Sequence, residues 1–168
     1  DASTPAPVRD QAWVYLGKVL YAAGQFQDSE RALRSVAGDL PPSLAPERLL
    51  LLAQGLMYRG RFDEAVAVLD GWTGAPEWTA YAQFNLGVAL VRAGREERGL
   101  ALLDGVGTLV TENPELASLR DKANVAIGYA QLQAGRPAAA RLALDRVQLA
   151  GSQANKALLG AGWADAAE

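Results

Sequence analysis

The sequence contains no cysteine and no histidine. The missing side chains exclude disulfides and the zinc sites that are built on Cys or His ligands. They also exclude Ser–His and Cys–His nucleophiles, together with the general base that enzymes most often use near neutral pH. We therefore expect no metal site, no cofactor and no catalytic residues. A lack of cysteine fits any compartment.

Long apolar runs and an excess of positive charge are missing as well. No window of about 20 residues is apolar enough to cross a bilayer, so we expect no direct membrane insertion. Lys and Arg number 16 against 19 Asp and Glu, which gives a net charge of −3. Nucleic acid is not an expected partner, because its phosphates favour a clustered basic surface. The 168 residues are half apolar, which is ordinary for one globular domain with a core.

A helix–turn–helix pattern stands out at Leu49–Leu69. Its first apolar residues follow the helical spacing i, i+3, i+4 and i+7: Leu49, Leu52, Ala53 and Leu56. Gly60 interrupts this stripe, and a second one runs from Ala65 through Leu69 to Trp72. The stretch is therefore predicted to form a helix, a short turn and a second helix.

The same pattern recurs along the chain. The glycines at the predicted turns are 36, 34 and 41 residues apart: Gly24, Gly60, Gly94 and Gly135. The stripes that follow some of these turns are expected to end near Val36, Val106 and Val147. Acidic pairs such as Asp63-Glu64 lie at the start of the predicted second helices. There the positive end of the helix dipole stabilises their negative charge.

Local signals predict several helix ends. Ser43 is expected to cap the helix after the Pro41-Pro42 pair. In the long gap before the fourth unit, Asn113 is the predicted N-cap and Pro114 the first helical residue. A last helix is predicted over residues 153–167, either as a cap on the array or as half of a fifth unit.

These residues resemble the tetratricopeptide repeat. That motif has the pattern W-x2-L-G-x2-Y, then Gly, an aromatic, an Ala and a Pro, over about 34 residues. The resemblance divides the chain into repeats at 10–43, 46–79, 80–113 and 121–154. Their matching residues include Trp13, Leu16, Gly17, Leu20, Phe26, Pro41, Phe62, Leu86, Gly87, Leu90, Ile127, Gly128 and Ala140. The departures are Ser29 and Gly99 for Ala, Glu96 and Pro137 for the aromatic, and the polar Asn124 and Gln131 in the stripe.

The resemblance implies an all-α fold, a right-handed α-solenoid of stacked antiparallel helix hairpins. It implies about four repeats plus a C-terminal helix in a single domain, residues 1–168. Small residues recur at one phase, at Gly17, Ala53, Gly87 and Gly128. Because glycine inside a helix costs about 1 kcal/mol relative to alanine, this recurrence indicates close approach of the two helices of a unit.

In this family the first helices line a concave groove. The resemblance therefore points to a non-catalytic scaffold that holds a protein or peptide partner on residues of the first helices that lie off the packing stripe. The candidate residues are Lys18, Tyr21, Gln54, Met57, Tyr58, Tyr81, Phe84, Val88, Arg92, Tyr129 and Gln133. The same spacing also selects Val14, Leu50, Val125 and Leu132. The alternative for each tyrosine is that it simply packs between neighbouring helices.

Two narrower functions are disfavoured. Family members that clamp acidic C-terminal tails use Lys and Arg on the first helix of the third repeat. At the corresponding positions this chain has Phe84 and Val88. Gly-Arg pairs such as Gly60-Arg61 could suggest phosphate loops, but their recurrence at three of the predicted hairpin turns indicates turn chemistry instead.

The second function that stays open is a structural one. The alternative is a spacer or self-association segment of a larger assembly, such as one of the cell envelope, with Leu159 and Trp163 of the last helix stacking on another copy. Because the chain begins at Asp1 and not at Met, we expect it to be processed or cut from a longer protein. Composition suggests a bacterial source. The compartment stays open, with a slight preference for the periplasm over the cytoplasm.

Overall fold

The computed structural model describes residues 5–167, and every regular element in that range is a helix. The helices are α1 (Ala6–Ala22), α2 (Phe26–Arg34), α3 (Leu44–Tyr58), α4 (Phe62–Leu69), α5 (Pro76–Arg92), α6 (Glu96–Gly107), α7 (Pro114–Gln133), α8 (Pro137–Leu144) and α9 (Ala154–Ala166). The predicted all-α helical-repeat class is confirmed.

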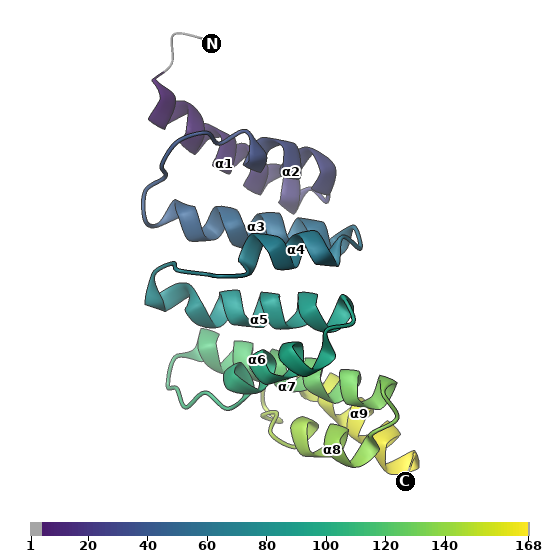
Figure 1. The fold of residues 1–168 in the computed structure, drawn as a ribbon. Helices are drawn as coiled ribbons and strands as arrows, with labels where there is room; N and C mark the ends of the chain where they lie inside the picture. Colours follow the sequence, from purple (N-terminus) through teal and green to yellow (C-terminus); the bar gives the residue numbers. More distant parts are fainter. Residues whose placement is uncertain (1–4, 168) are drawn as a thin grey trace. The chain divides into compact units, whose positions relative to one another are not determined.

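The chain forms two compact units, Asp1–Ala89 and Leu90–Glu168, which we call unit 1 and unit 2. Unit 1 holds α1–α4 and most of α5, and unit 2 holds the end of α5 and α6–α9 (Figure 1). The predicted single domain and the repeat boundaries stay predictions.

Glycine allows the tight turns between paired helices. Gly24, Gly60, Gly94 and Gly135 have φ between +69° and +79°, the left-handed region that a Cβ disfavours. At the α3–α4 turn, the amide of Gly60 donates to the carbonyl of Met57 at 3.0 Å, and the next amide donates back to Leu56 at 2.9 Å. These bonds satisfy the last carbonyls of the helix. The predicted turn role of the four glycines is confirmed.

The helix ends agree with the sequence in part. Asn113 caps α7: its side chain accepts from the amide of Glu115 at 2.8 Å, and Pro114 is the first helical residue, as predicted. Ser43 is the residue before α3, as predicted, but the expected capping bond is absent: its backbone angles are helical and its side chain makes no capping hydrogen bond. Trp72, Val36 and Val147 also lie beyond the ends of their helices, although Val36 and Val147 are buried.

In unit 1, leucines fill spaces that glycine leaves open. A Cβ built on Gly17 of α1 would lie 2.5 Å from a methyl carbon of Leu33 on α2. Ser29 stands where the family has alanine, and its hydroxyl donates to the carbonyl of Gly17 at 2.8 Å, so the buried polar group has a partner. The α1–α2 contact therefore depends on a missing Cβ and one buried hydrogen bond.

Unit 2 repeats this arrangement between α7 and α8. A Cβ on Gly128 would lie 2.4 Å from Cγ of Leu144. The polar stripe residue Asn124 is fully buried, and its side-chain amide donates to the carbonyl of Gly107 at 2.8 Å, which joins α7 to the end of α6. The departures from the family pattern at Ser29 and Asn124 thus both make hydrogen bonds to backbone carbonyls of a neighbouring helix.

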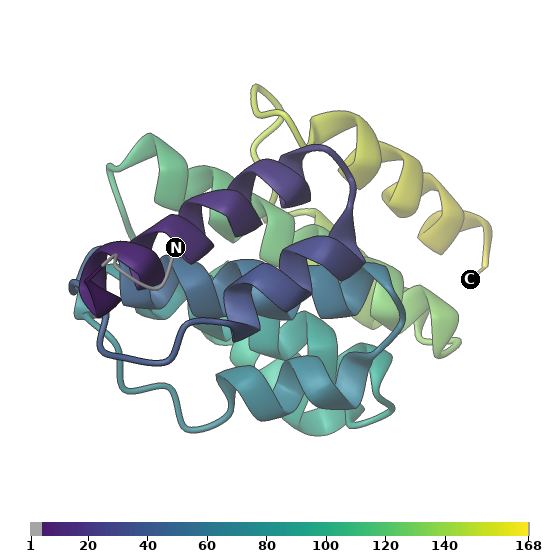
Figure 2. The same ribbon diagram turned by 90° about the horizontal axis from the view of Figure 1, so that it is seen from above.

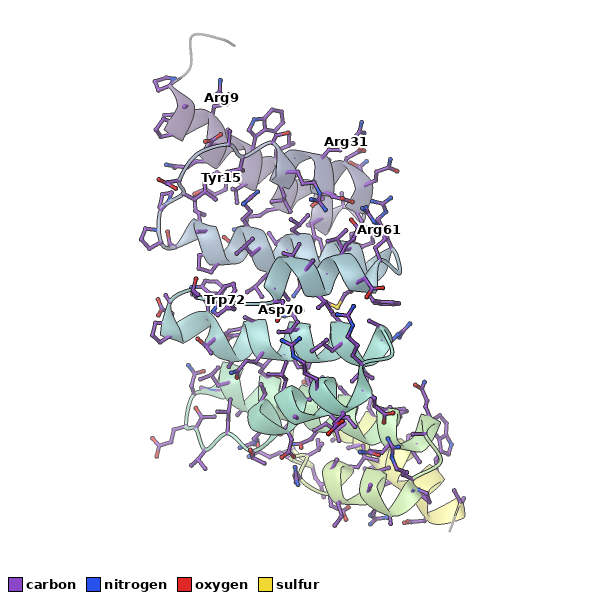
Figure 3. The ribbon with its side chains drawn as sticks, viewed as in Figure 1. Arg9, Tyr15, Arg31, Arg61, Asp70 and Trp72 are labelled. Atoms are coloured by element: carbon purple, nitrogen blue, oxygen red, sulfur yellow. The ribbon has the colours of Figure 1, made fainter. Side chains whose placement is uncertain are left out.

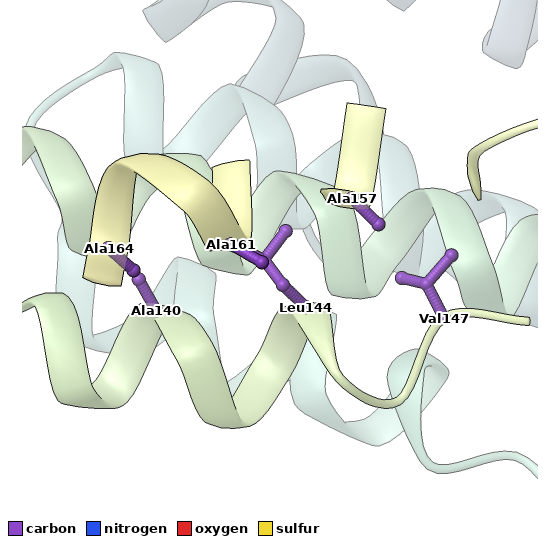
Figure 4. Close-up of a cluster of buried hydrophobic side chains, with 6 residues drawn as sticks. All are labelled: Ala140, Leu144, Val147, Ala157, Ala161 and Ala164. Carbon is purple, nitrogen blue, oxygen red and sulfur yellow. The ribbon is translucent and has the colours of Figure 1, made fainter. Parts of the chain in front are cut away.

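Helix α9 packs on α7 and α8 through small side chains. Figure 4 shows the cluster that they form: Ala140, Leu144, Val147, Ala157, Ala161 and Ala164. Within unit 2, α9 lies at the outer edge of its helices in the view of Figure 2. Its larger residues Leu159 and Trp163 lie outside the cluster and are 52% and 53% exposed. The last helix therefore covers α7 and α8 with alanine and leaves about half of the leucine and tryptophan side chains accessible.

Candidate functional site

The candidate residues of unit 1 lie on α1, α3 and α5, and helical spacing places them on shared faces. Lys18 and Tyr21 are three residues apart on α1, and Gln54 and Tyr58 are four apart on α3, so each pair forms neighbours on one side of its helix. We call this surface the first-helix face of unit 1. Its members are Lys18, Tyr21, Gln54, Met57, Tyr58, Tyr81, Phe84, Asn85 and Val88.

An aromatic cluster joins α1 and α3 on this face. Tyr58 stacks on Phe26 with ring centroids 4.6 Å apart and an angle of 1° between the planes, and Tyr21 meets both rings edge-on. Burial, and then the interaction with the Tyr58 phenol, raise the pKa of Tyr21 to about 12. Tyr58 is nevertheless 69% exposed. Tyr21 thus serves packing, whereas Tyr58 is a fixed ring that is open to solvent.

Polar pairs also connect neighbouring first helices. Nζ of Lys18 on α1 lies 2.6 Å from a carboxylate oxygen of Glu47 on α3, and 5.8 Å from the centre of the Tyr15 ring. The side-chain amide of Gln54 on α3 donates to Asn85 of α5 at 3.2 Å, and Asn85 donates to the carbonyl of Tyr81 at 2.8 Å. Both candidate residues are therefore fixed in place, and Lys18 is already neutralised by a carboxylate.

The remaining candidates of unit 1 are half-buried. Met57 on α3 and Tyr81, Phe84 and Val88 on α5 each keep part of their side chain accessible. Tyr81 lies beside Trp78, with ring centroids 6.0 Å apart. These side chains add apolar surface to the first-helix face of unit 1.

In unit 2 the structure gives the candidates different surroundings. Tyr129 of α7 packs against α9: its ring meets Trp163 edge-on at 5.9 Å, and its hydroxyl donates to the carbonyl of Lys156 at 3.1 Å. Tyr129 is thus a packing residue, the alternative that the sequence left open. Arg92 and Gln133 are the last residues of α5 and α7, and both are exposed.

The wider set selected by family spacing is wrong as a list of accessible groove residues. Val14 and Leu50 are buried in the core, and Val125 and Leu132 pack against the α8–α9 cluster. The periodicity that defines a helix face cannot tell a groove position from a position covered by the neighbouring hairpin.

Sequence reasoning missed an ionic cluster at the turn end of unit 1. Glu30 of α2 is nearly buried and accepts hydrogen bonds from three arginines, Arg34 at 2.9 Å, Arg59 at 2.5 Å and Arg61 at 2.6 Å. Arg61, labelled in Figure 3, also pairs with Glu64. The available signal was the pair of arginines, Arg59 and Arg61, on either side of the Gly60 turn, but only the fold shows that these two come from the next hairpin to meet Glu30.

Two buried carboxylates form a second feature that the sequence did not reveal. Asp10 of α1 accepts from the amide of Gly38 at 2.8 Å, and Asp121 of α7 accepts from that of Gln148 at 3.4 Å. Each lies in the first half of its helix and holds the segment after the paired second helix. Both are thus structural groups, and neither belongs to the first-helix face.

Two cavities lie outside the first-helix face of unit 1. In unit 2 an open cavity of about 680 Å³ lies beside the Gly94 turn, where Arg136 pairs with both Glu96 and Gln131. In unit 1 a cavity of about 340 Å³ lies between the segments before α3 and after α4, next to Trp72 (Figure 3). Across residues 5–167, no cluster of acidic side chains could hold a metal ion. None of the helices in this range is long and apolar enough to cross a membrane.

Comparison with known proteins agrees with the helical repeats. A model of the tetratricopeptide repeat family matches residues 50–107, about a third of the chain, and this match confirms the resemblance predicted from the sequence. Repeats of this family generally mediate protein–protein interactions, and their all-helical fold is typically non-catalytic. A search of the curated proteins and a search of the solved structures found no match.

Proposed function

We propose that the chain is a non-catalytic scaffold that binds a protein or peptide segment on the first-helix face of unit 1. The observation that carries this proposal is Tyr58, which is 69% exposed yet stacked on Phe26. A ring whose position is already fixed loses little conformational entropy on binding, and aromatic residues are enriched among the residues that dominate binding energy.

The chemistry of this face favours one class of segment. Met57, Phe84 and Val88 supply half-buried apolar surface, and the Gln54–Asn85 pair supplies amide donors and acceptors beside it. The only lysine of the candidate set is neutralised by Glu47 at 2.6 Å. We therefore expect a segment with apolar or aromatic anchors, and not one that is recognised by its negative charge.

Photo-crosslinking tests this proposal. A crosslinking amino acid replaces Met57 on the first-helix face, and a matched control carries it at Ala67, an exposed position on α4. We expect a partner to be captured from a bacterial lysate at position 57 and not at 67, and to be lost when Tyr58→Ala is added. Equal capture at both positions, or capture that Tyr58→Ala leaves unchanged, contradicts the proposal.

A second candidate function is self-association through α9, which would suit a spacer in a larger assembly. The observation that favours it is the exposure of Leu159 and Trp163 on the outer side of this helix. Sedimentation velocity tests it: a species that grows with concentration and disappears in Trp163→Glu supports self-association, and a monomer at every concentration contradicts it.

A further inference from the structure

The outer side of α9 combines two protruding leucines with a notch. Leu158 and Leu159 are both more than half exposed, and Gly162 follows one helical turn later. A Cβ built on Gly162 would have nothing within 4 Å, so open space lies above this glycine. Trp163 is the next residue along this helix.

Within each unit, a leucine fills the space above a helical glycine. Leu33 occupies the space above Gly17 in unit 1, and Leu144 occupies the space above Gly128 in unit 2, with closest approaches of 2.5 Å and 2.4 Å to the Cβ position. Gly162 also lacks a side chain, but it is exposed, the space above it is open, and it lies on a helix face that carries its own leucine.

The tryptophan beside the notch is held in position. Tyr129 meets the Trp163 ring at an interplanar angle of 83°, and its hydroxyl is fixed by the carbonyl of Lys156. The flank of α9 that bears Trp163 is thus ordered by α7. A surface that is already ordered loses less conformational entropy when a partner covers it.

We propose that α9 pairs with α9 of a second copy in antiparallel orientation, with Leu159 of each copy seated at Gly162 of the other. This inference rests on the self-association proposed above and specifies its geometry. In a parallel pair in register, Leu159 would oppose Leu159 and leave both notches empty. An antiparallel two-fold arrangement makes the same surface complementary to itself.

The flanking charge agrees with the antiparallel register. Lys156 and Trp163 are seven residues apart, two helical turns, and therefore lie on the same flank of α9. An antiparallel pair aligned on Leu159 and Gly162 brings Lys156 of each copy near Trp163 of the other, where an ammonium group and an indole ring attract. Because stable interfaces bury about 1,200–2,000 Å² and this face is one short helix, we expect a weak dimer.

Filling the notch tests the proposal without damaging the fold. Gly162→Leu places a side chain in open space and improves helix propensity, so the melting temperature should stay or rise. We expect its dimer to dissociate about tenfold or more readily in sedimentation velocity. Gly105→Leu on α6 is the matched control, because Gly105 is also an exposed helical glycine with nothing within 4 Å, and it should leave the dimer intact.

Cysteine cross-linking tests the orientation, since the natural chain has no cysteine that would interfere. Asn155 and Ala166 are exposed positions on the same side of α9, and the antiparallel register places them opposite each other. A mixture of Asn155→Cys and Ala166→Cys chains should form the mixed disulfide in preference to either homodimer.

The outcomes separate this inference from the proposal on which it rests. A monomer at every concentration overturns both. A dimer that Trp163→Glu disrupts but Gly162→Leu spares keeps self-association and overturns the Leu159–Gly162 seating. Homodimeric disulfides of Asn155→Cys in preference to the mixed one overturn the antiparallel orientation.

Discussion

Helices α3 and α9 carry apolar residues at equivalent phase, yet bury them to different extents. Leu52 and Leu56 of α3 are 4% and 0% exposed, whereas Leu159 and Trp163 of α9 are 52% and 53% exposed. Helix α3 packs against both α2 and α4, while α9 packs against α7 and α8 with its alanine side. Helical periodicity therefore defines a face, and the neighbouring hairpins decide whether that face becomes core.

Truncating one leucine in each helix should give the largest difference in stability between α3 and α9. Leu56→Ala removes a fully buried side chain and should lower the free energy of unfolding by about 2–5 kcal/mol. Leu159→Ala removes an exposed one and should change it by less than about 0.5 kcal/mol. Urea denaturation followed by circular dichroism measures both, and similar losses would show that α9 is covered in solution by a contact outside the described chain.

The helical glycines give the next largest contrast. Gly128→Ala forces a Cβ to within 2.4 Å of the buried Leu144 and should cost about 1–3 kcal/mol. Gly162→Ala meets nothing and should stabilise the protein by up to about 1 kcal/mol. Thermal melts of the two variants should therefore shift in opposite directions, and a shared direction would argue against the α7–α8 packing.

Alanine substitutions at the two polar departures, Ser29 and Asn124, sharpen the comparison between the units. Asn124→Ala removes the donor to the carbonyl of Gly107 at the end of α6, and should cost roughly 1–2 kcal/mol. Ser29→Ala should cost less, because the Gly17 carbonyl lies inside α1 and keeps its helical bond. Denaturation midpoints of the two variants, each compared with that of the parent protein, check this order. A larger loss of stability for Ser29→Ala than for Asn124→Ala would contradict it.

The smallest expected effect is a pH dependence that comes from unit 1. Burial and Tyr58 raise the pKa of Tyr21 to about 12 from an ordinary value of 10. The folded state thus favours the neutral phenol, so its contribution is complete below pH 10 and is lost as the pH rises toward 12. Tyr21→Phe should flatten the decrease in stability over that range in denaturant titrations. An unchanged slope would mean that other groups cause it.

The sequence predicted local backbone features more accurately than it predicted which side chains are buried. The turn glycines and the Asn113–Pro114 start of α7 follow from backbone chemistry, which acts over a few residues. Ser43 precedes α3 as predicted but makes no capping bond, because its backbone is already helical and the carbonyl of Pro41 accepts from the amides of Leu44 and Ala45.

The candidate site was predictable only in outline. Spacing placed Tyr58 and Tyr129 in the same class, but Tyr58 is open to solvent while Tyr129 is packed against α9. Asn85 was missed, although an amide next to the apolar Leu86 was a signal of a buried hydrogen bond. These distinctions depend on contacts between hairpins, and contacts of that kind are not encoded in the period of a single helix.

The position of Glu30 has a consequence for cooperativity. Its carboxylate belongs to the first hairpin, but two of its three arginine partners, Arg59 and Arg61, belong to the second. Opening the second hairpin would leave a nearly buried charge with one partner, so the first hairpin loses stability at the same moment. The α1–α2 hairpin is therefore coupled to its neighbour by charge as well as by packing, and any motion that opens the second hairpin also weakens the first.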